Sequence, residues 1–264
     1  MRSWIRNHLI ATAVIGTALA IGATTTMDAI GQSNFNSLPL IPLFFLFWYL
    51  TRLSRADIGL AWGRPRDYAL AVFYPVVVVG LIALVAFASG AVSTAHTDWA
   101  HVGVQVVTSL VFTLILAILT EEGIFRGWLW ATLQRAGVGT GGLLVVTSLA
   151  FAAWHVSTAV LPTGFHPPLI PVYLANAAVI GFTWGLIRLK SGSIVVASVS
   201  HSVYNTLDYI FIGVGTTAGA LGIQNLSVFD PEGWFGLALN VTFAAVLWLV
   251  LSPGRAIKRA EVTQ

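Results

Sequence analysis

Residues 102–127 read VGVQVVTSLVFTLILAILTEEGIFRG, and this stretch decides how the rest of the sequence is interpreted. The run up to residue 118 carries no charge, yet Glu121, Glu122 and Arg126 follow it at once. The next residues, IFRGWLWATL, are again apolar and aromatic, which argues against a helix end that simply leaves the membrane with a solvated charge cluster. Charged side chains inside a membrane are costly and by default mark function or an internal ion pair.

The composition identifies an integral membrane protein of the all-α class. The chain has 264 residues, of which 57% are hydrophobic and only 9% are charged, and its mean hydropathy is +0.85. A soluble domain would carry roughly 25% charged residues. The net charge is +3, but the basic residues are dispersed, which excludes a nucleic-acid-binding surface. The chain has no cysteine, so disulfides and thiolate chemistry are excluded as well.

Eight segments are apolar enough to be predicted as membrane helices, each of which needs about 20 residues to cross. They are 8–27, 38–51, 68–90, 104–134, 143–161, 172–189, 194–214 and 235–252. The second is short, and the fourth is too long to cross upright. The first begins like a signal peptide, but its apolar stretch is long for one, and we expect an uncleaved anchor.

The basic residues support this count and orient the chain. They are Arg2, Arg6, Arg52, Arg55, Arg64, Arg66, Arg126, Arg135, Arg188, Lys190, Arg255, Lys258 and Arg259. All of them fall on one side of the predicted topology, whereas the four opposite loops, 28–37, 91–103, 162–171 and 215–234, contain none. Loops rich in Lys and Arg stay in the cytoplasm. We therefore expect a multi-pass protein of the cell (plasma or inner) membrane with both termini cytoplasmic.

Three predicted helices carry charged, imidazole or amide side chains into the membrane interior. These residues are Glu121, Glu122, Arg126, His155, His201, Asn205 and Asp208. Glu121 and His155 lie equally far along the chain from Val138, in the turn of a predicted helical hairpin. His201 and Asn205 lie roughly 10–17 Å along their own helix at 1.5 Å per residue. Stray polar residues would not be expected to share a depth, so the sequence predicts one internal site.

Helical spacing separates the two carboxylates. Glu122 and Arg126 are four residues apart, share a helix face and are predicted to form an ion pair. Glu121 is turned by about 100° from Glu122, so it is predicted to be the free carboxylate. His201 and Asn205 also share a face.

Two further residues have less defined roles. Asp208 lies near the stripe of His201 and Asn205, where it either orients a histidine or is a charge near the outer boundary. Phe151, one turn before His155, is expected to pack the helix rather than to take part in chemistry.

A carboxylate, two imidazoles and an amide suit hydrolysis by activated water. Glu121 can act as general base and His155 can hold the water or pass the proton. His201 and Asn205 can donate hydrogen bonds to an oxyanion. Zinc-assisted hydrolysis with Glu121, His155 and His201 as ligands is the alternative, although the H-E-x-x-H signature is absent. The cofactor is thus either none or a divalent metal such as zinc.

Three motifs resemble those of the CPBP intramembrane proteases, which include the type II CAAX prenyl endopeptidases and bacteriocin-processing or Abi-type relatives. EEGIFRG (121–127) resembles E-E-x-x-x-R, FAAWH (151–155) resembles F-x-x-x-H, and HSVYN (201–205) resembles H-x-x-x-N. The stretch ADIGLAWGRPRD (56–67) is similar to the linker usual in the family. The motifs cover about 105–210.

The resemblance implies a helical bundle with a cavity open to the cytoplasm. It implies Glu121 as the water-activating base with His155 as its partner, and it implies supporting and oxyanion-binding roles for four further residues. These are Glu122 and Arg126 as supports and His201 with Asn205 as oxyanion donors. We expect one membrane domain, 1–264, with a protease core at about 104–214 and accessory N-terminal helices at 8–51.

The expected activity is therefore that of an intramembrane endopeptidase. Its substrate is expected to be a prenylated protein tail or a peptide such as a bacteriocin precursor, with membrane lipid as the other partner and no nucleic acid. An inactive member that binds a peptide, for instance as an immunity protein, is the first alternative. A transporter is the second, but inverted repeats and broken helices are not evident in the sequence.

Overall fold

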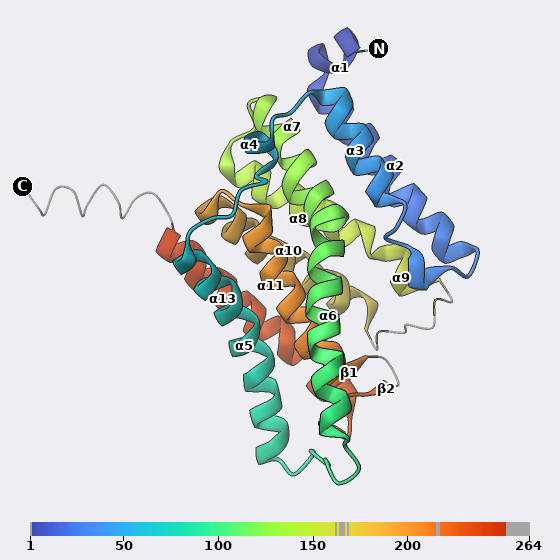
Figure 1. Ribbon diagram of the computed structural model, residues 1–264, viewed down its shortest axis with the longest axis vertical. Helices are drawn as coiled ribbons and strands as arrows, with labels where there is room; N and C mark the ends of the chain where they lie inside the picture. The colour runs from blue at the N-terminus through green and yellow to red at the C-terminus, as the bar shows by residue number, and fades with distance from the viewer. Residues whose placement is uncertain (1, 162, 164–166, 168, 215–216, 252–264) are drawn as a thin grey trace, which may run out of the picture.

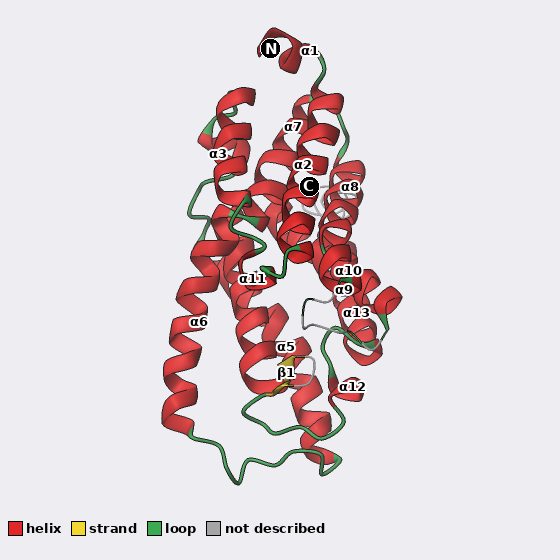
Figure 2. Ribbon diagram, turned by 90° about the vertical axis from the view of Figure 1, so that its right-hand side faces the viewer, coloured by secondary structure: helices red, strands yellow, loops and turns green. Residues whose placement is uncertain are grey.

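The chain folds into an all-α bundle, which confirms the predicted fold class. The computed structural model describes residues 2–161, 163, 167, 169–214 and 217–251. Most helices run roughly along the long axis (Figure 1). Within the described residues the one strand pair lies toward the end opposite the N-terminus (Figure 2).

The elements follow one another along the chain with short connections. The N-terminal half contains α1 (Arg2–Asn7), α2 (Leu9–Ala29), the 3₁₀ turn η1 (Ser33–Phe35), α3 (Leu40–Thr51), α4 (Arg55–Ile58), α5 (Pro65–Ala88), α6 (Trp99–Leu119), the π-helix η2 (Glu122–Leu129) and α7 (Trp130–Arg135). The C-terminal half contains α8 (Thr140–Trp154), α9 (Val156–Val160), α10 (Ile170–Ser191), α11 (Ile194–Leu207), the π-helix η3 (Asp208–Ile212), β1 (Gly213–Val214), β2 (Thr217–Ala218), α12 (Leu226–Phe229) and α13 (Trp234–Leu251).

Each of the eight predicted spans falls on a helix, but the predicted number of eight crossings is not confirmed. Among the described residues, 6 helical segments are long and apolar enough to cross a membrane. The two predicted spans that do not qualify correspond to α3, which has 12 residues, and α11, which has 14. At 1.5 Å per residue either helix is about 20 Å long, less than the roughly 30 Å of the hydrocarbon core.

Three predicted spans are not the continuous helices that we expected. The span 104–134 breaks at Thr120, whose φ of −120° and ψ of −96° lie outside the helical region. The span 143–161 breaks at His155, between α8 and α9. The span 194–214 changes to a π-helix at Asp208 and ends in the strand β1.

Glycine explains why the first break can form. A Cβ at position 123 would lie 2.5 Å from the backbone oxygen of Ile118. The wide turn of the π-helix therefore needs Gly123. Single π-helical turns within α-helices often occur at functional sites.

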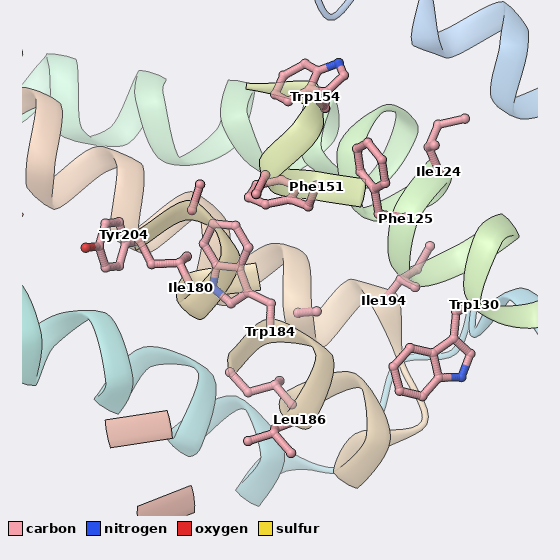
Figure 3. Packing of buried hydrophobic residues seen from close by; sticks show 14 of the residues in the cluster. Ile124, Phe125, Trp130, Phe151, Trp154, Ile180, Trp184, Leu186, Ile194 and Tyr204 are labelled. Carbon is pink, nitrogen blue, oxygen red and sulfur yellow. The ribbon is translucent and has the colours of Figure 1, made fainter. Parts of the chain in front are cut away.

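Helix α10 is the centre of the bundle. It packs against α8, α11 and α13, and α11 in turn packs against α5 and α6. Phe151, Trp184 and Tyr204 are among the large buried side chains of this core (Figure 3). The outer face of α6 is exposed and apolar, as expected of a surface that contacts lipid; it carries Val104, Val107, Val111, Phe112 and Ile115.

A neutral polar network joins four helices inside the core. We call Tyr74, Asn176, Tyr204 and Asn240 the amide–tyrosine network. The Asn240 amide donates to Asn176 Oδ1 at 2.8 Å and to the Tyr204 hydroxyl at 3.1 Å, and it accepts from the Tyr74 hydroxyl at 2.7 Å. The Asn176 amide and the Tyr204 hydroxyl also donate to the carbonyl of Pro231. Such hydrogen bonds between helices stabilise bundles in membranes.

The linker 52–64 is fastened to the bundle mainly through its backbone. Arg135 donates to the Thr51 carbonyl, just before the linker, and Arg188 donates to the Asp57 carbonyl. The backbone N–H of Ile194 donates to the Gly59 carbonyl at 2.9 Å. This end of the bundle lies near the N-terminus (Figure 1) and gathers basic residues, as the topology predicts. The cytoplasmic orientation itself stays a prediction.

Candidate active site

Glu121 and Glu122 lie at the junction between α6 and the π-helix η2. The helix break at Thr120 turns the chain immediately before them. The two side chains differ in exposure, because Glu122 is fully buried and Glu121 is 16% exposed. One carboxylate is therefore enclosed by protein, and its neighbour keeps an open side.

The predicted ion pair between Glu122 and Arg126 is present. Arg126 Nη1 lies 3.1 Å from Glu122 Oε1, and both side chains are fully buried. The guanidinium carbon lies 4.3 Å from the centroid of the Phe151 ring and 5.5 Å from that of Trp184. A Cβ at position 181 would come within 2.8 Å of Arg126 Nη2, so Gly181 leaves the space that the arginine fills.

His201 lies between the two carboxylates. Its Nδ1 is 3.2 Å from Glu122 Oε1, and its Nε2 is 3.7 Å from Glu121 Oε2. Since a carboxylate accepts hydrogen bonds, Nδ1 is the protonated nitrogen in the pair with Glu122. The imidazole also stacks on Trp184, with the ring centroids 4.0 Å apart and the planes inclined by 15°. We call Glu121, Glu122, Arg126 and His201 the carboxylate–imidazole cluster.

His155 lies at the break between α8 and α9. Its Nδ1 is 2.9 Å from the Phe151 carbonyl, which can only accept, so Nδ1 carries the proton and Nε2 keeps its lone pair in the neutral ring. The Phe151 ring is close to both histidines, with its centroid 4.5 Å from that of His155 and 6.3 Å from that of His201. Phe151 thus links His155 to the cluster through ring contacts.

Asn205 lies one turn after His201 on α11, as the spacing predicts. Its side chain is partly buried and makes no hydrogen bond with the described residues. Asp208 follows at the start of η3, is 2% exposed, and its Oδ1 has no partner among the described residues. The carboxylate that contacts His201 Nδ1 is Glu122, and among the described residues Asp208 has no hydrogen bond to a histidine, so the orienting role that we considered for Asp208 stays a prediction.

The sequence did not reveal all the residues that shape this site. Trp184 was not predicted, although its position between Gly181 and Gly185 gives a hint, because small neighbours let a large ring approach other helices. Phe151, expected to be packing alone, contacts both histidines and covers Arg126. Asp28 was placed in a loop, but α2 extends to Ala29 and buries this carboxylate to 1% exposure.

The candidate ligand set for zinc was Glu121, His155 and His201. Within the described part of the chain, no group of three or more His, Cys, Asp or Glu side chains is arranged to hold a metal ion. His155 directs Nδ1 to the backbone carbonyl of Phe151. These residues do not form a three-ligand site in this arrangement, and we derive the chemistry from side chains and water.

Comparison with known families bears on the same residues. Residues 102–207 match the family described as type II CAAX prenyl endopeptidase Rce1-like. We call residues 102–207 the Rce1-like segment. The resemblance to the CPBP proteases is thereby confirmed over these residues. No curated protein matches the chain.

The Rce1-like segment contains all six predicted site residues, whereas α2, α3 and α5 lie before it. The match indicates an intramembrane protease of the CAAX type, and hence a peptide or lipidated protein as substrate. The apolar helices and the family together identify a membrane protein.

Proposed function

We propose that the chain is an intramembrane endopeptidase in which Glu121 activates the attacking water. The observation that supports this most directly is the placement of one imidazole between two unlike carboxylates. Glu122 is enclosed and neutralised by Arg126, whereas Glu121 is partly exposed and 3.7 Å from His201 Nε2. That distance is too long for a hydrogen bond but suits a water molecule that contacts both groups.

The proposed reaction balances with Glu121 as the only group that changes its proton. Glu121 takes a proton from water while the water oxygen attacks the carbonyl carbon, and the carbonyl electron pair moves to oxygen. The protonated Glu121 then gives this proton to the amide nitrogen as the carbon–nitrogen bond breaks. Glu121 returns to its carboxylate form, and an acid and an amine are released.

His201 and Asn205 are the proposed donors to the oxyanion. Donation from His201 Nε2 requires the doubly protonated ring, because Nδ1–H is directed to Glu122. The Asn205 amide has no hydrogen bond among the described residues and lies one turn away on the same face. A preorganised donor of this kind is worth about 3–4 kcal/mol in the transition state.

His155 is proposed as the partner of Glu121 that helps to hold the water through Nε2. The neutral tautomer set by the Phe151 carbonyl leaves this atom as an acceptor. The substrate is proposed to be a prenylated protein tail or a peptide precursor that is cleaved at the cytoplasmic face.

The second alternative function, a transporter, has to be compared with the protease because the helices are interrupted at Thr120, His155 and Asp208. Discontinuous helices are typical of transporter sites as well, so the breaks do not separate the two functions. The Rce1-like match does, and it favours the protease.

Cleavage by matched variants tests the proposal. Wild type, Glu121→Gln and the buried control Tyr74→Phe are purified in detergent and incubated with a panel of prenylated and plain peptides, with and without chelator. We expect Glu121→Gln to lower cleavage by about 10²–10⁴-fold and Tyr74→Phe to leave it unchanged. Cleavage by Glu121→Gln at the wild-type rate would overturn the assignment.

The chelator arm separates the two hydrolytic mechanisms. Loss of cleavage with chelator would show metal dependence, whereas indifference to chelator would support water activated by Glu121 alone. A wild-type protein that binds the peptides tightly but cleaves none would instead be a peptide-binding member.

A further inference from the structure

The last two turns of α2 carry two buried polar side chains on one face. Thr24 is 0% exposed and Asp28 is 1% exposed, and they are four residues apart. This helix lies outside the Rce1-like segment. Burying a carboxylate costs several kcal/mol unless its oxygens are hydrogen-bonded. The hydrogen-bond partners of Asp28 therefore show which residues this side chain holds in place.

Those partners flank His155 on both sides. The Trp154 indole N–H donates to Thr24 Oγ1 at 2.7 Å. The Ser157 and Thr158 hydroxyls donate to Asp28 Oδ2 at 2.6 and 3.2 Å. Thus α2 holds the residue immediately before His155 and the second and third residues of α9 after it.

Asn36 completes the arrangement from the connection after α2. Its side-chain amide donates to Asp28 Oδ1 at 3.0 Å and lies 3.3 Å from Thr158 Oγ1. Its backbone carbonyl accepts from the Thr24 hydroxyl at 3.2 Å. Both oxygens of Asp28 therefore accept hydrogen bonds, and every group around them is a donor, which is the environment that suits a carboxylate rather than an amide.

The position of His155 depends on this arrangement because the helix is broken there. At φ −79° and ψ −8°, His155 ends α8, and its N–H donates to the Ala152 carbonyl at 3.1 Å, the spacing of a tighter turn than that of an α-helix. In a continuous helix, the backbone hydrogen bonds fix the direction of the helix axis. At a break, contacts with other parts of the protein set the direction of the second helix. Asp28 and Thr24 supply such contacts.

We propose that Asp28, assisted by Thr24, is a positioning residue that sets His155 for catalysis from outside the Rce1-like segment. This inference rests on the proposed function of His155. Removing a residue that orients a catalytic group typically costs about 10–100-fold in activity. The effect is expected on kcat, because the substitution changes the placement of a group that acts in the chemical step.

The chain offers a matched control. Thr26 lies in the same two turns of α2 and, unlike Thr24, donates its hydroxyl to the Gly22 carbonyl of its own helix. We therefore compare Asp28→Asn, Thr24→Val and Thr26→Val in full-length protein. We expect kcat for peptide cleavage to fall about 10–100-fold in Asp28→Asn and less in Thr24→Val, with KM unchanged and Thr26→Val like wild type.

A double-mutant cycle asks whether the effect passes through His155. In a His155→Ala background, Asp28→Asn should lower kcat little further, because the group that it positions is already gone. A reduction as large as in the wild-type background would mean that Asp28 acts on general stability and would overturn the proposal.

A readout without catalysis keeps this test separate from the proposed function. In protein labelled at histidine, the imidazole signals of His155, assigned with His155→Gln, should move in Asp28→Asn and stay in place in Thr26→Val. Unmoved signals in both Asp28→Asn and Thr24→Val would overturn the positioning role even if the wild type cleaves no tested peptide. If Asp28→Asn does not fold, Thr24→Val and Ser157→Ala decide the matter by the same criteria.

Discussion

The amide–tyrosine network and the carboxylate–imidazole cluster both lie inside the bundle, but they use their polar atoms differently. In the network each amide and hydroxyl has a hydrogen-bond partner. In the cluster, Glu122 Oε2 and two nitrogens of Arg126 have none among the described residues, and Glu121 and His201 face each other beyond hydrogen-bond distance.

The difference separates polar groups that hold helices together from polar groups that are available for chemistry. A neutral and satisfied network costs little to bury and fixes the packing of four helices. A charged and incompletely satisfied cluster is expensive to bury, so its retention indicates a role besides stability. Substitutions should therefore change stability alone in the network and activity above all in the cluster.

The largest expected effect comes from removing one member of the buried ion pair. Arg126→Met leaves Glu122 enclosed without its cation, which should lower the free energy of unfolding by about 3–5 kcal/mol and abolish cleavage. Thermal unfolding in detergent and the cleavage assay measure both. The double variant Glu122→Gln with Arg126→Met should recover part of the stability without the activity; no recovery would mean that the pair is not coupled.

Crowding the arginine should give the next effect. Gly181→Ala brings a Cβ within 2.8 Å of Arg126 Nη2 and 3.2 Å of Phe151 Cδ1. Overpacking of this kind costs about 1–3 kcal/mol, and a shift of Arg126 should also lower kcat. Gly80→Ala is the control, because a Cβ there has no neighbour within 4 Å. If Gly181→Ala and Gly80→Ala had the same free energy of unfolding and the same kcat, the packing beside Arg126 would not be as tight as we infer.

A substitution in the amide–tyrosine network should affect stability only. Asn240→Leu leaves Asn176 Oδ1 and the Tyr74 hydroxyl without their partner. The free energy of unfolding should fall by about 1–2 kcal/mol, which is the usual contribution of buried hydrogen bonds in soluble and membrane proteins. The kcat of the folded protein should be unchanged, and a loss of kcat comparable to that of Gly181→Ala would erase the distinction between the two regions.

The smallest effect is expected outside both regions, at the linker. The backbone N–H of Ser54, 2.7 Å from Asp57 Oδ2, is the main cause that holds the pKa of Asp57 below its ordinary value of 3.8. The folded state releases the proton of the Asp57 carboxyl more readily than the unfolded state does. The stabilisation by Asp57 is therefore complete above pH 3.8 and is lost as the pH falls through the pKa of the folded state. The stability difference between wild type and Asp57→Asn should therefore shrink from pH 7 to pH 3. A constant difference would contradict this assignment.

The sequence predicted what depends on local pattern. The helical spans follow from apolar length, and the ion pair between Glu122 and Arg126 follows from spacing that survives even in a π-helix. The shared depth of Glu121 and His201 follows from counting along helices from the same side of the bundle.

The sequence did not predict what depends on neighbouring helices. The breaks at Thr120 and His155 carry no Pro or Gly at the broken residue, and Gly123 permits the first break without marking its position. The burial of Asp28 is decided by donors on α9, which lie more than a hundred residues away. Which carboxylate orients His201 was likewise a tertiary question, answered by the packing of α11 against η2.

The linker 52–64 has a consequence for how freely this protein can vary. Its path is held at backbone carbonyls by side chains and amides of the bundle, among them Arg188 and Ile194. Carbonyls are the same in every residue type, so these backbone contacts do not depend on the side chain at the accepting position. Other linker positions are constrained: Leu53 and Ile58 are buried in the core, and Gly59 and Gly63 have φ angles of +81° and +68° that favour glycine. Between these two points, the 81% exposed Trp62 marks a position where sequence drift can alter the surface without moving the chain.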